Sequence, residues 1–230
     1  MKPRIFQLID LDRTLFDTSL FVKAITDEIN KTEPGVGTKL DELFEAAYTS
    51  DETFFLLRHL RQEHGDAAFE ALVARVVEVL LGADALILDG VTARLAEVDE
   101  LSSYQPAWGI LTYGDDIDQR MKARLIGMQD APLLVTQTPD KSELIRSWQM
   151  PDGTFQLPEE FGGGIVDCIT LEDDKLRAFN GLPKGAFGFW ITSNPQADVM
   201  LAEGIHAGIP ATVRAIKDVS HATEFIQKML

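Results

Sequence analysis

Two acidic residues and a hydroxyl residue lie close together near the start of the chain, directly after an apolar segment. Asp10, Asp12 and Thr14 follow the segment from Ile5 to Ile9, in which only Gln7 is polar. Such a segment is typical of a strand in a parallel sheet that is covered on both faces. Neighbouring carboxylates repel each other and are costly to bury unless a metal ion or a proton lies between them. We therefore predict a chemical site here, with the strand ending at Asp10 and the chain turning there.

A second apolar segment also ends in a hydroxyl residue. The segment from Gly109 to Leu111 leads into Thr112, Tyr113 and Gly114. A hydroxyl at this point can cap the next helix or contribute to an anion site. Lys141 stands at the start of another predicted helix, where its charge opposes the helix dipole. An anionic partner would compensate for this, so we expect Lys141 to have one.

The last polar segment is a run of three acids. Glu172, Asp173 and Asp174 follow the apolar segment from Ile165 to Leu171. Acidic runs are commonly solvated loops, but carboxylate oxygens gathered at a strand end are the ligands that Mg²⁺ selects. The run therefore offers candidate Mg²⁺ ligands, and the pattern by itself leaves open which of Glu172, Asp173 and Asp174 bind the metal.

The segments that carry these residues alternate with helical patterns after residue 88. Apolar runs occur at 107–111, 132–135, 165–171, 187–191 and 209–213, and helical stretches separate most of them. This alternation predicts an α/β fold with a Rossmann-like, doubly wound parallel sheet. Because ligands of such sheets bind at the carboxyl ends of the strands, we expect the polar residues to converge there.

The intervening part of the chain has a different pattern. Between residues 17 and 87 apolar residues recur with the helical period, most clearly at 69, 72, 73, 76, 77 and 80. We predict an all-helical cap domain over 17–87, inserted into an α/β catalytic core formed by 1–16 and 88–230.

The composition restricts the class of partner. The 230 residues include 21 Lys and Arg against 37 Asp and Glu, a formal net charge of −16, and the basic residues form no cluster. This argues against duplex nucleic acid or an anionic membrane as the principal partner. No apolar segment is long enough to cross a membrane, and the single cysteine, Cys168, is interpreted as a buried thiol. We expect a cytoplasmic protein, and the sequence leaves its oligomeric state open.

Together, the four polar segments resemble the motifs of the haloacid dehalogenase-like (HAD) superfamily of phosphohydrolases. The sequence Asp10-Leu11-Asp12-Arg13-Thr14 resembles the first motif. Thr112 with Gly114 resembles the second motif, Lys141 the third, and the pair Asp173 and Asp174 the fourth. The resemblance spans residues 5 to 175, whereas the predicted cap carries no family signature.

The resemblance implies a two-step phosphoryl transfer. Asp10 would attack phosphorus and form an aspartyl-phosphate, and Asp12 would act first as general acid and then as general base. Mg²⁺ would be held by Asp10, by Asp12 through its backbone carbonyl, and by Asp173 and Asp174. The residues implied to bind the phosphoryl group are Leu11, Thr112, Tyr113, Gly114 and Lys141. The cap would close over the site and select the substrate.

The function predicted on this basis is Mg²⁺-dependent hydrolysis of a small phosphorylated metabolite whose identity stays open. A dehalogenase of the same superfamily would not need Asp12, and a phosphomutase could use this acid to return the phosphate to a sugar. A phospho-aspartate signalling protein is a further alternative, but such proteins lack the Asp-x-Asp-x-Thr turn and the long helical insertion. Arg13 departs from the small residue often found in this motif, and we favour a surface position for it over a phosphate or cap contact.

Overall fold

The computed structural model describes residues 3–50, 55–81, 83–202, 204 and 208–229. The chain divides into two compact units. The core unit comprises Met1–Leu15, Leu88–Tyr113 and Asp130–Leu230, and the helical unit comprises Phe16–Ile87 and Gly114–Gln129. No helix among the described residues has both the length and the apolar character needed to cross a membrane.

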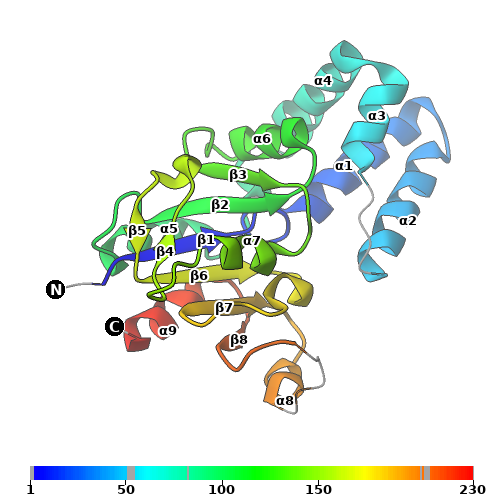
Figure 1. The fold of residues 1–230 in the computed structure, drawn as a ribbon. Coiled ribbons are helices and arrows are strands. Elements are labelled where there is room, and N and C mark those ends of the chain that lie inside the picture. The colour runs from blue at the N-terminus through cyan, green and yellow to red at the C-terminus, as the bar shows by residue number, and fades with distance from the viewer. Residues whose placement is uncertain (1–2, 51–54, 82, 203, 205–207, 230) are drawn as a thin grey trace. The chain divides into compact units, whose positions relative to one another are not determined.

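A six-stranded, fully parallel sheet forms the centre of the core unit (Figure 1). Its strand order is β3-β2-β1-β6-β7-β8. The strands are β1 (Ile5–Ile9), β2 (Trp108–Tyr113), β3 (Leu133–Thr136), β6 (Cys168–Asp173), β7 (Ala186–Ile191) and β8 (Val213–Ile216). All five residues of β1 are buried, which explains its apolar sequence. The predicted Rossmann-like, doubly wound sheet is therefore confirmed.

Helices cover both faces of this sheet. On one face, Ile5 of β1 packs in a cluster with Phe189 of β7 and with Ala222 and Ile226 of the last helix. On the other face, Phe6 and Leu8 of β1 pack with Ile145. The helices of the core unit are α5 (Val91–Val98), α7 (Lys141–Ser147), α8 (Ala197–Ala202) and α9 (Ala222–Met229). Successive residues of β1 thus pack on opposite faces of the sheet, as the two-residue period of a strand requires.

The strand predicted over 165–171 is wrong at one point. The structure divides it into β5 (Ile165–Val166), which pairs antiparallel with β4 (Phe155–Gln156), and β6. The break falls at Asp167, whose carboxylate accepts hydrogen bonds from the backbone and the guanidinium of Arg4. A polar anchor inside the apolar run therefore separates the two strands. The strand predicted over 209–213 begins later in the structure, where β8 spans Val213–Ile216.

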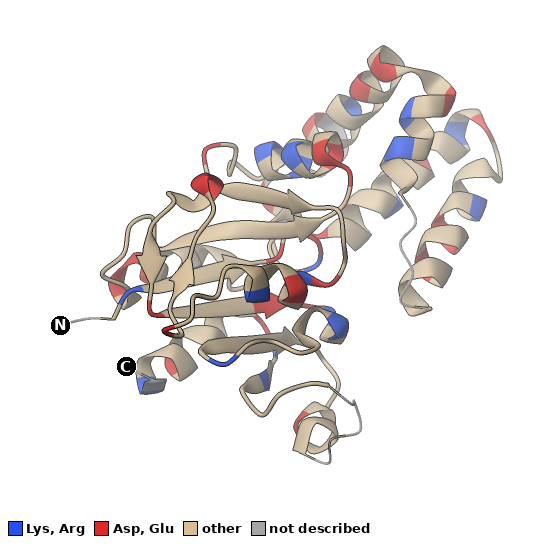
Figure 2. Cartoon of the chain, in the orientation of Figure 1, with Lys and Arg blue, Asp and Glu red and all other residues tan. Residues whose placement is uncertain are grey.

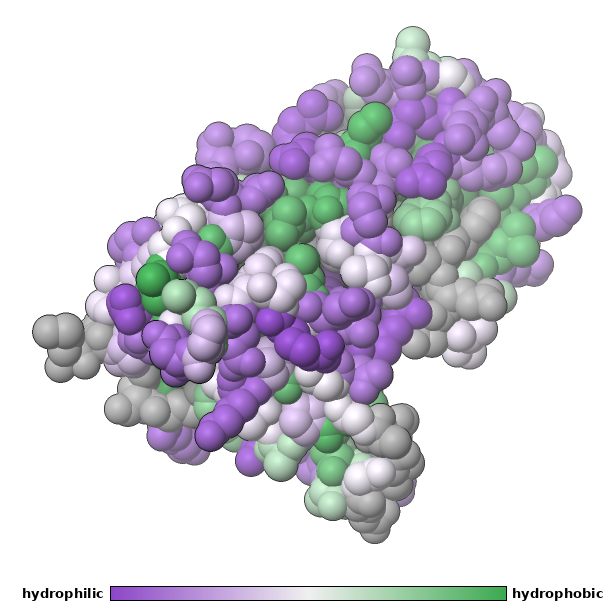
Figure 3. Space-filling view, in the orientation of Figure 1, coloured by the Kyte–Doolittle hydropathy of each residue, from purple (hydrophilic) through white to green (hydrophobic). Residues whose placement is uncertain are grey.

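The helical unit contains the predicted insertion and one additional segment. Its helices are α1 (Thr18–Thr32), α2 (Val36–Thr49), α3 (Leu56–His64), α4 (Asp66–Arg75), which continues into a π-helix over Val76–Leu81, and α6 (Asp116–Leu125). The chain enters and leaves the insertion side by side, because the backbone N–H of Asp17 donates to the carbonyl of Leu86 and Phe16 bridges to Ile87. Figure 3 shows hydrophilic side chains over much of the visible surface of this unit.

The segment 114–129 was predicted to belong to the core, but its contacts group it with the insertion. Two ion pairs link this segment to α3. Arg58 of α3 donates to the Asp115 carboxylate at 2.9 Å, and Arg61 pairs with Asp118. Figure 2 shows basic residues on α3 and both acidic and basic residues on α6. The Arg58 guanidinium holds the pKa of Asp115 below its usual value, although partial burial opposes this.

Candidate active site

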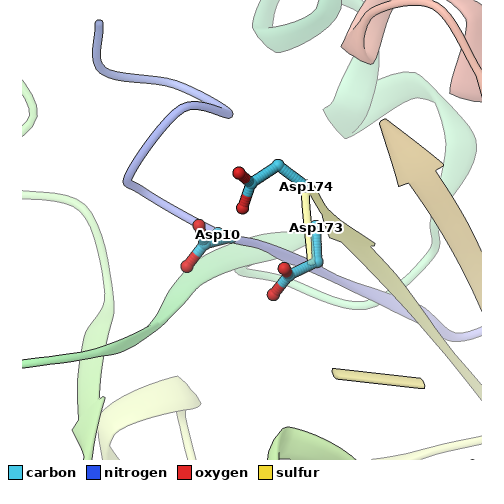
Figure 4. A group of neighbouring side chains, drawn as sticks. All are labelled: Asp10, Asp173 and Asp174. Carbon is cyan, nitrogen blue, oxygen red and sulfur yellow. The ribbon is translucent and has the colours of Figure 1, made fainter. Parts of the chain in front are cut away.

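Three carboxylates meet where β1 and β6 end. Asp10 follows the last residue of β1, Asp173 is the last residue of β6, and Asp174 follows it. One carboxylate oxygen of each lies within 4.8 Å of the other two (Figure 4). Parallel pairing explains the meeting, since Ile9 pairs with Glu172 and the two strands therefore end at the same level. The predicted convergence of Asp10, Asp173 and Asp174 is thus present in the structure.

Lys141 lies against two of these carboxylates. Its Nζ donates to Oδ1 of Asp10 at 2.5 Å and to Oδ2 of Asp173 at 2.6 Å. All three side chains are buried, with 4% of Lys141, 8% of Asp10 and 3% of Asp173 exposed. Lys141 is the first residue of α7, and the N-cap of this helix is Asp140, whose carboxylate accepts from the Glu143 backbone N–H. The anionic partners expected for Lys141 are therefore its two neighbours in the site.

The buried charges shift the proton affinities of both ion-pair partners. Burial raises the pKa of Asp10 well above its usual value, and Asp173 and Asp174 raise it further against the opposing effect of Lys141. Burial alone would lower the pKa of the Lys141 ammonium, but the charges of Asp10 and Asp173 raise it above its usual value. Burial is thus the main cause of the shift at Asp10, whereas the neighbouring carboxylates are the cause at Lys141.

The donor set fits a divalent cation. When ionised, the three carboxylates carry −3 and Lys141 carries +1, which leaves −2 in a site where only Asp174 is partly exposed. All three groups offer oxygen atoms, which Mg²⁺ prefers over nitrogen or sulfur. The carboxylate of Asp12 is not part of this group of three, and the backbone role that the resemblance implies for Asp12 stays a prediction.

The segment after Asp10 forms a tight turn. β1 stops at Ile9, and the backbone N–H of Leu15 donates to the Leu11 carbonyl at 3.0 Å. Leu11 is fully buried, and Arg13 adopts a left-handed conformation with φ of 59°. The predicted turn at Asp10 is therefore confirmed. Glycine would adopt this positive φ without steric cost, whereas the Cβ of Arg13 makes the conformation unfavourable.

The second-motif residues lie at the end of β2. Ile9 pairs with Ile110, so Thr112 and Tyr113 extend β2 toward the edge of the sheet at which Asp10 lies. Thr112 is buried, with 1% exposed. Gly114 begins the segment that belongs to the helical unit, and a Cβ there would lie 2.3 Å from Nε2 of Gln119. The glycine thus has a packing reason of its own. Phosphate binding by Leu11, Thr112, Tyr113, Gly114 and Lys141 stays a prediction.

Glu172 lies outside the acidic cluster. It precedes Asp173 on β6, so its side chain points to the opposite face of the sheet. There its carboxylate accepts from Arg94 of α5 at 2.6 Å, and both side chains are fully buried. Burial raises the pKa of Glu172, and Arg94 opposes that shift. Sequence reasoning missed Arg94, although its place between Val91 and Val98 on the buried face of α5 was a signal.

The comparisons with known proteins agree with this fold. No protein-family model matches the sequence, and no curated protein is similar to it in sequence. Among solved structures, a protein described as a haloacid dehalogenase-like hydrolase from Burkholderia xenovorans is similar over 99% of both chains, with a TM-score of 0.64 and 17% identity.

Two further structures show the same likeness. A HAD-hydrolase from Bacillus subtilis described as bound to magnesium is similar over 98% of this chain and 99% of its own, with a TM-score of 0.57 and 16% identity. The L-2-haloacid dehalogenase of Xanthobacter autotrophicus is similar over 98% of this chain and 99% of its own, with a TM-score of 0.54 and 14% identity. The resemblance seen in the motifs is confirmed at the level of the fold, and the chain has the fold of the HAD-like hydrolases.

Proposed function

We propose that this chain is a Mg²⁺-dependent phosphatase of the HAD-like superfamily that hydrolyses a small phosphorylated metabolite. The observation that carries the proposal is the group of Asp10, Asp173 and Asp174, of which the first two are buried and the third is half-buried, balanced in part by Lys141. Its net charge of −2 suits one divalent cation and would repel an anionic substrate without it. The magnesium in the Bacillus subtilis structure supports the choice of metal.

The chain's own residues have distinct tasks in this reaction. Lys141 holds Oδ1 of Asp10, which leaves Oδ2 to attack phosphorus. The new Oδ2–phosphorus bond forms while the ester oxygen leaves, and Asp12 gives that oxygen a proton. In the second step Asp12 takes a proton from water, the water oxygen bonds to phosphorus, and the bond to Asp10 breaks. Mg²⁺, held by Asp10, Asp173, Asp174 and the backbone carbonyl of Asp12, would neutralise charge on the phosphoryl oxygens.

A dehalogenase is the second candidate, since its likeness in fold is comparable. Asp12 favours the phosphatase because displacement of a halide needs no acid to protonate the leaving group. A buried acidic group also favours it, because a halide displacement requires no metal site. A phosphomutase or a phospho-aspartate switch would share Asp10 and the metal ligands, so these alternatives are separated by their products.

The decisive experiment measures phosphate release from a panel of phosphorylated sugars, nucleotides and organic acids, with Mg²⁺ and with EDTA. We expect metal-dependent turnover in the wild type and its loss in Asp10→Asn and Asp12→Asn. Asp167→Asn is the matched control, because Asp167 precedes the same strand β6 at its other end and pairs with Arg4. Chloride release from a 2-haloacid would favour the dehalogenase. A stable phosphoprotein without phosphate release would favour the switch.

A further inference from the structure

A buried polar network lies on the face of the core sheet opposite the acidic group. Arg94 of α5 is fully buried, and its Nη2 donates to Oε1 of Gln7 and to Oε1 of Glu172, both at 2.6 Å. Its Nε donates to the same carboxylate at 3.2 Å, and its Nη1 to the Thr223 hydroxyl at 3.4 Å. Gln7 is held in turn, because its Nε2 donates to the carbonyl of Val98.

This network joins the two strands that position the acidic group. Gln7 belongs to β1 and lies three residues before Asp10, whereas Glu172 belongs to β6 and directly precedes Asp173. The two strands also meet at a backbone hydrogen bond, in which Asp10 N–H donates to the Glu172 carbonyl at 2.9 Å. One guanidinium therefore fixes both strands at the level where they deliver their carboxylates.

Stability alone gives a weak reason for this arrangement. Removing two charges from water is costly, and a well-packed apolar pair of similar volume is often as stable as a buried ion pair or more so. An apolar pair, however, makes no directional hydrogen bonds. The planar fork of an arginine imposes a fixed geometry on the groups that it binds. The buried pair of Arg94 and Glu172 thus suits a place where position matters more than stability.

We infer that Arg94 is a positioning residue for the metal site, acting through Glu172 and Gln7 to set the separation of Asp10 and Asp173. This inference rests on the proposed function, since it concerns the same carboxylates. Arg94 touches neither the metal ligands nor the substrate, and it acts by holding the ends of β1 and β6 in register. Its loss should weaken Mg²⁺ binding, as loss of supporting groups around metal ligands commonly does by about 10–100-fold.

The test uses the double variant Arg94→Met with Glu172→Met, which removes both buried charges at once. Urea unfolding measures stability, and calorimetric titration of the metal-free protein measures Mg²⁺ affinity. We expect a folded protein whose unfolding midpoint falls modestly, because the buried Gln7 amide oxygen loses its donor, and a Mg²⁺ affinity reduced by about 10–100-fold. If the double variant does not fold, Arg94→Lys keeps the charge but loses the fork, and a native midpoint with weakened Mg²⁺ binding supports the same inference.

The chain offers a matched control on the same two strands. Arg4 and Asp167 pair at 2.6 Å just before β1 and β6 begin, at the opposite end from the acidic group. The double variant Arg4→Met with Asp167→Asn should leave Mg²⁺ affinity unchanged. Unchanged affinity in the Arg94 variants, or an equal loss in this control, would overturn the inference. A wild type that neither binds Mg²⁺ nor releases phosphate would instead overturn the proposed function, and the inference with it.

Discussion

Lys141 connects two buried carboxylates, so its removal tests how the site is balanced. Its Nζ lies 2.5 Å from Asp10 and 2.6 Å from Asp173, and 4% of its side chain is exposed. The variant Lys141→Met keeps the aliphatic stem but leaves both carboxylates buried without their cation. Breaking a buried pair in this way costs about 3–5 kcal/mol. At about 2–4 °C per kcal/mol for a chain of this size, we expect the Tm of the metal-free protein to fall by about 6–20 °C.

Mg²⁺ should reverse part of this loss. The variant site would carry −3 instead of −2, so the cation should raise the Tm of Lys141→Met by more than it raises that of the wild type. Phosphatase turnover should stay low at saturating Mg²⁺, because Asp10 has lost the group that orients it. Circular dichroism during heating, in EDTA and in excess Mg²⁺, measures both effects on stability.

The control is an ion pair of the same length at the surface. Nζ of Lys23 lies 2.6 Å from Oδ1 of Asp27, with 58% and 54% of the two side chains exposed. Such a pair contributes about 0.3–0.5 kcal/mol, so Lys23→Met should lower the Tm by about 2 °C or less. If the Tm of Lys141→Met fell no more than that of Lys23→Met, burial would not increase the contribution of the Lys141 ion pairs to stability. That result would refute the reasoning.

Three further predictions follow from single residues. Excess Mg²⁺ at about 100 times its Kd should stabilise the wild type by about 2.7 kcal/mol in urea unfolding. Asp173→Asn should lose this stabilisation. An equal stabilisation of the variant would exclude Asp173 as a ligand. Burial raises the pKa of the Cys168 thiol to about 12. Its thiolate at pH 8 should therefore be about 1,000-fold scarcer than that of an ordinary thiol, and a disulfide reagent should label it correspondingly slowly. Rapid labelling in native buffer would contradict this. Arg13 has a φ of 59°, a left-handed conformation that glycine adopts without the steric penalty of other residues. Urea unfolding should therefore show Arg13→Gly to be more stable than Arg13→Ala by about 1 kcal/mol. Equal stabilities would show that the turn carries no strain.

Much of the fold and part of the site could be predicted from the sequence. The apolar run before Asp10 and the alternation after residue 88 predicted a parallel sheet, and parallel strands must deliver their carboxyl ends to one edge. Each apolar run is continuous in sequence with the acids at its end, so a short segment is enough to predict a strand with acids at its carboxyl end. That the strands ending at Asp10 and Asp173 lie next to each other was implied by the family resemblance, and the strand order of the sheet shows it.

Other features depended on contacts that no local pattern encodes. The choice between Glu172 and its neighbours required the register of β6 and the presence of Arg94, 78 residues away, on the opposite face. Asp167, where the strand breaks, pairs with Arg4, and α6, which groups with the insertion, pairs with Arg58 and Arg61.

The sequence by itself therefore determined the strands and the types of group at their ends, because hydrophobic periodicity and residue chemistry are properties of short segments. The tertiary structure decided which acids meet at the ends of β1 and β6 and which are neutralised elsewhere. The physical reason is that a buried charge takes its role from its partner, and the partners here come from distant parts of the chain.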